Sequence, residues 1–383
     1  MATAARIDVI DRNPVSSLRG FLAALLEKGE VDALLVAQRL PIRNVVMPTL
    51  VTDPAKLAGA DPLAPVFPIN AAKIVSKLTR KPFGGRVAVV LRPCEIRAFI
   101  ELVKLKQGRV DDVLLIGFDC YGAYSNINYP RFGAAGGNGA DSTGLFYRNI
   151  REGRGTAFED FDLSPACKAC EHFVPDNADL MIGLVGVDVD ELLWVKPNTP
   201  AGDEVLHKLK MPAAPEPAAR KQALADLLVQ RRAYRDQMFV DTSEATSDLE
   251  KLMNYLGNCV NCYNCRVACP VCYCKECVFV TDVFDHEPSQ FFRWARKKGV
   301  LKMPTDTVFY HLTRLAHMST ACIGCGQCSN ACPNNVPVME LFRTIAHHTQ
   351  LAFSYTAGRS LEDEPPLSTF REKEFSEVTG GKD

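Results

Sequence analysis

Two cysteine runs near the C-terminal end constrain this chain more than any other feature. Both have the spacing C-x2-C-x2-C-x3-C followed by proline. In this pattern the first three thiolates bind three corners of one 4Fe–4S cluster, and the fourth binds the cluster of the other run. One cluster is therefore predicted on Cys259, Cys262, Cys265 and Cys332, and a second on Cys322, Cys325, Cys328 and Cys269. Zinc is the alternative, since it often uses C-x2-C pairs, but it has no need of two runs that each end in Cys-Pro.

The sequence between and after the runs predicts helices. A long insertion, residues 270–321, replaces the short hairpin of compact bacterial ferredoxins. Start and stop signals predict a helix over residues 288–299, and apolar spacing predicts two more over 306–317 and 336–348. With the two motifs, this region resembles the α-helical ferredoxin domain of heterodisulfide-reductase and succinate-dehydrogenase iron–sulfur subunits. We therefore predict a mostly α-helical, ferredoxin-like dicluster domain over residues 251–350.

Composition narrows the class of protein. The chain has 383 residues, 47% of them hydrophobic, which is enough for two packed domains. A formal net charge of −1 gives no electrostatic reason to expect a nucleic-acid partner. No apolar run approaches the length of a membrane span, and no signal-peptide core follows the first residues. With fifteen cysteines, these features predict a cytoplasmic protein whose thiols bind metal rather than form disulfides.

The first 195 residues alternate predicted strands with predicted helices. The strand patterns cover residues 31–37, 45–51, 86–91 and 112–117, and the helical patterns cover residues 16–28, 70–78 and 95–107. Such alternation is typical of an α/β domain with a mainly parallel sheet. We therefore predict one α/β domain over residues 1–195.

Four further cysteines stand where this sheet would gather them. Cys94 and Cys120 each follow the end of a predicted strand, and ligands of such sheets bind beyond the carboxyl ends of the strands. Cys167 and Cys170 form a C-x2-C pair in a later loop. Together they make a complete ligand set for a third 4Fe–4S cluster. Spacing alone leaves an alternative open, in which the first two are buried thiols and the last two a loop zinc pair.

The segments around these four cysteines resemble a known family. Pro93-Cys94-Glu-Ile-Arg-Ala98, Gly117-Phe-Asp-Cys120 and Cys167-x-x-Cys170-Glu171 are similar to the beta subunits of coenzyme F420-reducing hydrogenases and formate dehydrogenases. The resemblance covers about residues 15–190. It implies that Cys94, Cys120, Cys167 and Cys170 ligate one 4Fe–4S cluster and that FAD binds in the same domain.

The resemblance has departures that bear on the flavin. The family's early glycine-rich segment is replaced by residues 16–21, and its glycine before Pro-Cys is replaced by Leu91-Arg92. A glycine-dense loop at residues 133–139 could approach a phosphate closely, although such loops are more often plain turns. The sequence therefore leaves FAD binding open.

The segments outside the two domains are predicted as connections. Residues 196–250 are predicted to be linker and helix, because residues 196–200 and 211–217 are rich in proline and residues 218–240 have a helical pattern. The basic face of this helix is expected to be solvated, with a docking surface as the alternative. Its members are Arg220, Lys221, Arg231, Arg232 and Arg235. A polar tail over residues 351–383 is expected to be extended, on a partner or in solvent.

Cys272, Cys274 and Cys277 are surplus to three clusters. They predict either a fourth cluster or a zinc site, completed by a residue such as Asp282, Asp285 or His286 or by a neighbouring subunit. The alternative is three spare thiols beside the cluster.

Two functions follow, because the chain has cluster motifs but no recognisable hydrolase, nucleotide-loop or zinc-protease motif. The first is an iron–sulfur electron-transfer subunit of a cytoplasmic multi-subunit oxidoreductase. Its partners would be formate dehydrogenase, hydrogenase or heterodisulfide-reductase-like subunits. The alternative is an FAD-containing subunit that itself reduces or oxidises a deazaflavin or nicotinamide coenzyme. A third class, a zinc-stabilised binding module, would give a colourless protein.

Overall fold

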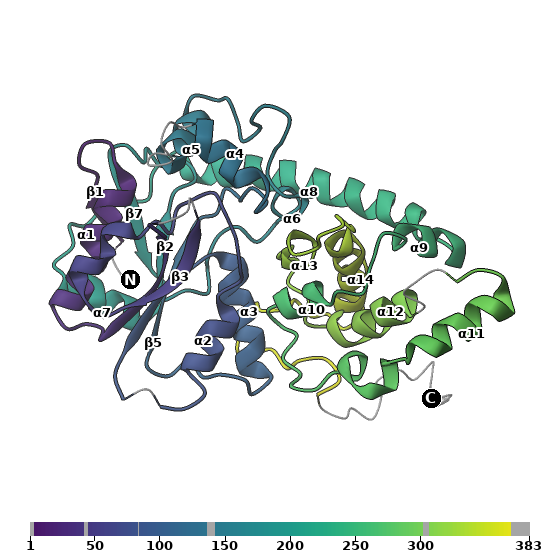
Figure 1. Ribbon diagram of the computed structural model, residues 1–383. Helices are drawn as coiled ribbons and strands as arrows, with labels where there is room; N and C mark the ends of the chain where they lie inside the picture. Colours follow the sequence, from purple (N-terminus) through teal and green to yellow (C-terminus); the bar gives the residue numbers. More distant parts are fainter. Residues whose placement is uncertain (1–3, 42–44, 83, 136–141, 302–305, 369–383) are drawn as a thin grey trace, which may run out of the picture.

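The computed structural model describes residues 4–41, 45–82, 84–135, 142–301 and 306–368. Its N-terminal half is built on a seven-stranded sheet with the order β1-β7-β6-β5-β4-β2-β3 (Figure 1). The strands are β1 (Ala5–Asp8), β2 (Ala33–Arg39), β3 (Val46–Val51), β4 (Val87–Leu91), β5 (Val113–Phe118), β6 (Leu180–Gly183) and β7 (Leu192–Pro197). The four central strands β6, β5, β4 and β2 pair in parallel. The predicted α/β domain with its parallel sheet is therefore confirmed at the centre, while the edge pairs are antiparallel.

Helices cover both faces of this sheet. They are α1 (Pro14–Glu27), the 3-10 turn η1 (Pro54–Gly59), α2 (Ala72–Leu78), α3 (Pro93–Lys104), α4 (Asn128–Ala135), α5 (Ser142–Arg151), α6 (Pro165–Lys168) and α7 (Pro200–Lys208). The three helices predicted before residue 110 correspond to α1, α2 and α3. Helix α3 begins two residues earlier than predicted, because the fixed φ of Pro93 suits the first helical position.

Alternation along the strands divides the apolar core in two. In β4, Ala88 and Val90 face the core that contains α1, while Val87 and Val89 face the core that contains α3. The second core does not stop at α3. It continues into the C-terminal half through residues such as Phe342, so the two halves share one hydrophobic interior.

The C-terminal half is helical, as the sequence predicts. Its elements are α9 (Leu249–Tyr255), α10 (Asn264–Ala268), the 3-10 turns η2 (Val278–Val280) and η3 (Asp282–Phe284), α11 (Pro288–Lys298), α12 (Thr307–Met318), α13 (Gln327–Asn330) and α14 (Val338–Ala352). The helices predicted at 288–299, 306–317 and 336–348 correspond to α11, α12 and α14. The short α10 and α13 follow the first thiols of the two cysteine runs.

The long helix α8 (Arg220–Ala245) spans both halves along one side of the molecule (Figure 1). The expectation that its basic face is solvated is wrong for three of its five residues. Arg220 is buried in a bidentate ion pair with Asp119. Arg231 donates hydrogen bonds of 3.0 and 2.8 Å to the carbonyls of Cys120 and Tyr121, and Arg235 pairs with Glu171. The face therefore docks within this chain, onto the loops beyond β5 and α6.

Part of the predicted linker is ordered structure on the sheet. Helix α7 packs beside β7, and its first turn is capped by Thr199, whose hydroxyl accepts from Gly202 N at 3.3 Å. Residues 212–214 then run beside β1, where Arg6 N donates to Pro212 O at 2.9 Å. The prolines of this segment interrupt helices, but the segment still packs on the α/β domain.

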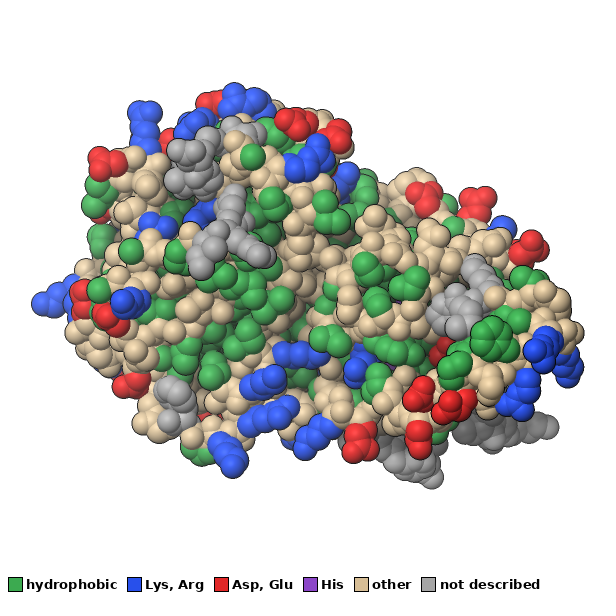
Figure 2. Space-filling model, in the orientation of Figure 1, with side chains coloured by type: hydrophobic (Ala, Val, Ile, Leu, Met, Phe, Trp, Pro, Cys, Tyr) green, Lys and Arg blue, Asp and Glu red, His purple; other side chains and the backbone are tan. Residues whose placement is uncertain are grey.

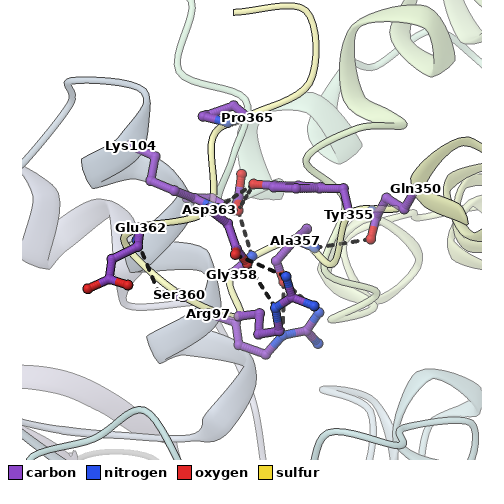
Figure 3. A network of polar contacts seen from close by, with 12 residues as sticks. Arg97, Lys104, Gln350, Tyr355, Ala357, Gly358, Ser360, Glu362, Asp363 and Pro365 are labelled. Carbon is purple, nitrogen blue, oxygen red and sulfur yellow. Dashed lines mark hydrogen bonds and ion pairs between the residues drawn. The ribbon is translucent and has the colours of Figure 1, made fainter. Parts of the chain in front are cut away.

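The start of the C-terminal tail also differs from expectation. Residues 353–363 turn back and lie on α3 of the same chain, rather than on a partner or in solvent (Figure 3). Tyr355 donates its hydroxyl hydrogen to Glu101 at 2.5 Å, and Gly358 N donates to the same carboxylate. Lys104 pairs with that carboxylate at 2.7 Å. We call residues 353–363 the C-terminal strap; residues 369–383 lie outside the described part.

Two surface observations complete the fold. Charges of both signs lie on the face in Figure 2, with Lys and Arg side chains gathered along its lower edge. Within the ranges that the structure describes, no helix is long and apolar enough to cross a bilayer.

Candidate iron–sulfur sites

The four cysteines predicted to hold a cluster in the α/β domain lie together, at what we call the sheet site. Cys94 is the second residue of α3, directly beyond β4, and Cys120 follows β5. The pKa of Cys120 is raised to about 11, mainly by burial, with Arg92 acting in the opposite direction and the nearby thiols of Cys167 and Cys170 adding to the rise. Burial also raises the pKa of Cys94, with added contributions from Cys120 and Cys170. All four thiols therefore lie close together, beyond the carboxyl ends of the central strands.

Local interactions position the loops that carry these cysteines. Glu95 accepts hydrogen bonds from Arg92 N at 2.9 Å and from Ala71 N at 2.8 Å, which anchors the first turn of α3 beside Cys94. Gly122 has φ of 115°, a conformation that favours glycine. A Cβ there would lie 2.6 Å from Leu163 Cδ1 and 3.1 Å from Cys167 Cβ. The loop beyond β5 can thus approach α6 closely only with glycine at this position.

The second run and Cys269 form another group, the middle site. Burial raises the pKa of Cys328, and the thiols of Cys269, Cys325 and Cys322 raise it further, while Arg314 lowers it. Burial likewise raises the pKa of Cys325, again with Cys269 and Cys322 contributing. The fourth cysteine of the first run therefore lies with the second run.

The first run and Cys332 form the third group, the outer site. Burial raises the pKa of Cys259, and the thiols of Cys265, Cys332 and Cys262 add to that rise. Cys265 is buried, whereas Cys262 is exposed. This group therefore has one edge at the surface. The exchange of fourth cysteines between the runs is the arrangement that paired motifs of this spacing require.

Side chains of α12 surround the outer site, and sequence reasoning missed them. Arg314 Nη1 donates to Cys265 Sγ at 3.1 Å, and Tyr310 Oη lies 3.4 Å from the same sulfur. His311 Nε2 lies 3.4 Å from Cys259 Sγ, and burial lowers the pKa of this histidine to about 4. The helical pattern of residues 306–317 predicted the helix, but nothing in it pointed to sulfur.

Neighbouring sites lie next to one another. The thiol of Cys325, in the middle site, contributes to the raised pKa of Cys94 in the sheet site, after burial. Gly326 allows this approach, because it has φ of 77° and a Cβ there would collide with Ala166 of α6. Gln327 then donates to Phe67 O at 2.8 Å, which fastens α13 to the α/β domain. The three sites therefore form a series in the order sheet, middle, outer.

The donor set fits 4Fe–4S clusters. Each site offers four cysteine sulfurs, and burial keeps thiols in all three sites protonated unless a cation displaces the proton, which bound iron does. Within the described ranges no three His, Cys, Asp or Glu side chains are close enough to share a single metal ion. A cubane spreads its four thiolates over four different irons.

Within the part of the chain that the structure describes, the three surplus cysteines do not join His, Asp or Glu in a group that could hold a single metal ion. Cys272 lies beside Cys269, whose thiol adds to the effect of burial in raising the pKa of Cys272. Cys274 is exposed, and Cys277 precedes η2. His286, one of the predicted helpers, packs against the rings of Phe291 and Trp294.

A polar cavity of about 440 Å³ lies beside the sheet site. It is lined by residues from the start of α1 and from α5, among them Arg12, Arg19, Asp61, Tyr147 and Arg151. Oδ1 of buried Asp61 has no hydrogen-bond partner within the described part of the chain. Burial raises the pKa of Tyr147, and Cys120 raises it further, so this tyrosine connects the cavity with the sheet site. Of the predicted glycine loop, residues 136–139 lie outside the described residues.

Comparisons with known proteins find similar chains. Residues 84–215 match the family described as the C terminus of the coenzyme F420 hydrogenase/dehydrogenase beta subunit, and residues 317–338 match a 4Fe-4S binding domain. The F420-dependent formate dehydrogenase subunit beta of Methanocaldococcus jannaschii is 27% identical over 359 residues, which cover 87% of this chain and 88% of that protein. The F420-dependent formate dehydrogenase 1 subunit beta of Methanococcus maripaludis is 25% identical over 368 residues, 89% of each chain.

A solved structure is also similar. It is a chain of the F420-reducing [NiFe] hydrogenase complex from Methanosarcina barkeri, with 14% identity, a TM-score of 0.42, and coverage of 62% of this chain and 92% of that chain. The resemblance seen in the sequence is thus confirmed by the family matches and the curated relatives. This chain is thus similar to the coenzyme F420 hydrogenase/dehydrogenase beta subunits over residues 84–215, and it matches a 4Fe-4S binding domain at residues 317–338.

Proposed function

We propose that this chain is the iron–sulfur electron-transfer subunit of a multi-subunit oxidoreductase, with three 4Fe–4S clusters that connect a catalytic partner to a second electron carrier. One observation carries the proposal: twelve cysteines lie as three groups of four, and consecutive groups adjoin. Cysteine thiolates in sets of four are the ligands that such clusters need. When bound, the clusters would supply one-electron chemistry, and the chain supplies the ligands, the spacing and a low-dielectric interior.

The series has two different ends. At one end, the polar cavity adjoins the sheet site through Tyr147. At the other end, Cys262 reaches the surface at the outer site. An electron relay needs access for a donor at one end and for an acceptor at the other, and both kinds of access are present here.

The partner is proposed from the relatives. Two formate dehydrogenase beta subunits align with almost the whole chain, so a formate-oxidising subunit is the first candidate, ahead of hydrogenase or heterodisulfide-reductase-like subunits. All fifteen cysteines are free thiols, which suits a reducing compartment such as the cytoplasm. A fourth metal site on Cys272, Cys274 and Cys277 remains a proposal that needs a further ligand, from this chain or from a partner.

A second function is favoured by the cavity. Arg12 and Arg19 beside the N-terminus of α1 suit a phosphate, and the free oxygen of Asp61 suits a hydroxyl or ring N–H of the same ligand. A flavin or deazaflavin has both kinds of group. In this version the chain would itself pass electrons between FAD and a soluble coenzyme, rather than serve as a relay alone.

One preparation tests the function and separates the two versions. The full chain, tagged and isolated without oxygen from cells that express it naturally, should be brown and should bring with it the catalytic subunit of an oxidoreductase. Protein identification of that subunit decides between formate dehydrogenase and the other candidates. A colourless chain that comes alone would contradict the proposal. Acid extraction of the same sample should release flavin only if the second version is correct.

A further inference from the structure

Among the described residues, four buried arginines form no ion pair with Asp or Glu: Arg92, Arg97, Arg231 and Arg314. Two of them, Arg97 and Arg314, lie between the candidate sites. Arg97 is 7% exposed and Arg314 is 4% exposed, and neither forms an ion pair with Asp or Glu in the described part of the chain. Arg97 donates from Nε and Nη2 to the carbonyl of Ala357, at 3.1 and 2.6 Å. Nε of Arg314 is buried with no hydrogen-bond partner among the described residues. Removing a charge from water is costly unless an opposite charge compensates it, so each guanidinium requires an anion nearby.

Arg97 lies between the sheet site and the middle site. Burial lowers its pKa, while the thiols of Cys170 and Cys94, both in the sheet site, act in the opposite direction. The guanidinium in turn lowers the otherwise raised pKa of Cys322, in the middle site. Its Nη1 reaches toward Ile323 O, at 3.5 Å, in the loop of the second run.

Arg314 lies between the middle site and the outer site. It donates to Cys265 Sγ of the outer site at 3.1 Å. Burial lowers its pKa, but the thiols of Cys265, and then Cys269 and Cys328 of the middle site, reverse that effect and leave it raised. Each arginine is therefore close to two of the three sites, and the middle site is close to both arginines.

The hydrogen bonds of the two guanidinium groups go to neutral carbonyls and to a cysteine sulfur, with no carboxylate among the described residues. A cubane bound by four thiolates carries net negative charge, and that charge increases when the cluster is reduced. A bound cluster is thus the counter-ion that the two arginines lack.

We propose that Arg97 and Arg314 are electrostatic spacers, each of which raises the reduction potential of the two clusters that flank it. The inference rests on the three clusters of the proposed function. A fixed positive charge favours the more negative, reduced form of a neighbouring cluster, and the hydrogen bond from Arg314 to sulfur acts in the same direction. The middle cluster, flanked by both arginines, receives both effects.

The C-terminal strap holds Arg97 in this place (Figure 3). The carbonyl of Ala357 accepts both of its strap hydrogen bonds, and Gln350 Oε1 accepts from Ala357 N at 3.1 Å. Gly358 has φ of 71°, and a Cβ there would collide with the backbone of Arg97. The strap therefore positions Arg97 as well as covering α3.

The test is a redox titration of the full, cluster-loaded chain carrying Arg314→Met or Arg97→Met. Electron paramagnetic resonance monitors each cluster during the titration. Arg314→Met should lower the potentials of the middle and outer clusters and leave the sheet cluster unchanged. Arg97→Met should lower those of the sheet and middle clusters and leave the outer cluster unchanged. We expect each affected reduction equilibrium to change about tenfold, which corresponds to ~59 mV for one electron. The signals are assigned from variants that each lack one cluster.

Three controls make the outcome decisive. Arg314→Lys and Arg97→Lys keep the charge and should retain most of the potential. Arg359→Met, an exposed strap arginine paired with Asp363, should move no potential. If Arg314→Met fails to assemble its clusters, Arg314→Gln keeps a donor for Cys265 but loses the charge, and must still show a fall in both potentials. Unchanged potentials in fully loaded variants, or an equal shift of all three clusters, would overturn the spacer role. An unmodified chain with clearly fewer than about twelve irons would instead overturn the proposed function, and the spacer role with it.

Discussion

Replacing Cys94 by Ser should remove one cluster and stop physiological electron transfer, while two clusters remain. Cys94 stands in the sheet site, between the polar cavity and the middle site, so its loss interrupts the series at its first member. Iron should fall from about twelve to about eight per chain. A small dye should still reduce the two ferredoxin-type clusters, because their cysteines are untouched. Transfer from the natural partner to the second carrier should fall to background.

The matched control is Cys274→Ser, which alters an exposed, surplus cysteine. It should keep the iron and the activity of a three-cluster chain. The fold of Cys94→Ser should persist, because the sheet has its own apolar core on the side of α1. Physiological transfer that survives Cys94→Ser unchanged would mean that the sheet site is structural, and that residues 251–350 alone carry the relay.

Replacing Cys269 by Ala should damage the cluster of the distant run more than that of its own. Cys269 lies with Cys322, Cys325 and Cys328, although it is close in sequence to Cys265. The middle cluster should therefore lose a ligand and, in most molecules, be absent or reduced to three irons. Because the middle site separates the other two, transfer through the series should fail as completely as in Cys94→Ser. Resonance spectra of the reduced protein distinguish the middle signal from the outer one.

Cys272→Ala is the matched control for this second experiment, since it removes a thiol three residues away. It should leave all three signals in place. If Cys269→Ala instead removed only the outer signal, each run would close on itself and the exchange of fourth cysteines would be wrong.

Local sequence patterns were sufficient to predict most of the elements that present the cysteines. Strands β4 and β5 are continuous apolar runs, typical of strands buried on both faces, and a cysteine follows each. Parallel strands meet at one edge, so the approach of Cys94 to Cys120 followed from connectivity alone. The spacing of the two runs likewise predicted that Cys269 belongs with the second run and Cys332 with the first, because this exchange of fourth cysteines is part of the motif.

Interactions across long sequence separations were not predictable in this way. Arg97 meets Ala357, 260 residues later, through a backbone carbonyl that has no sequence signature. Arg231 has the pattern of a solvated helix residue, yet it binds carbonyls of the loop beyond β5. Side-chain charge predicts exposure on average, and these arginines depart from the rule because carbonyls and thiols inside the fold accept their hydrogen bonds.

Glycines next to the cysteines indicate where two segments approach closely, which cysteine spacing alone does not predict. In the sequence Gly326 is simply part of the second cysteine run, whereas the structure shows that its missing side chain lets that run touch α6. Gly122 and Gly358 play comparable parts at the sheet site and at the strap. Glycines beside functional cysteines therefore indicate close approach, while the glycine-dense loop at residues 133–139 stands out by composition.

The most direct test of the three-cluster relay is the iron content of the unmodified chain, measured with the number of electrons that it takes up. Protein isolated without oxygen should contain about twelve irons and accept about three electrons from a low-potential dye, or about sixteen irons and four electrons if the surplus cysteines hold a fourth cluster. About eight irons and two electrons in a fully loaded sample would contradict the account, because the sheet site would then hold no cluster.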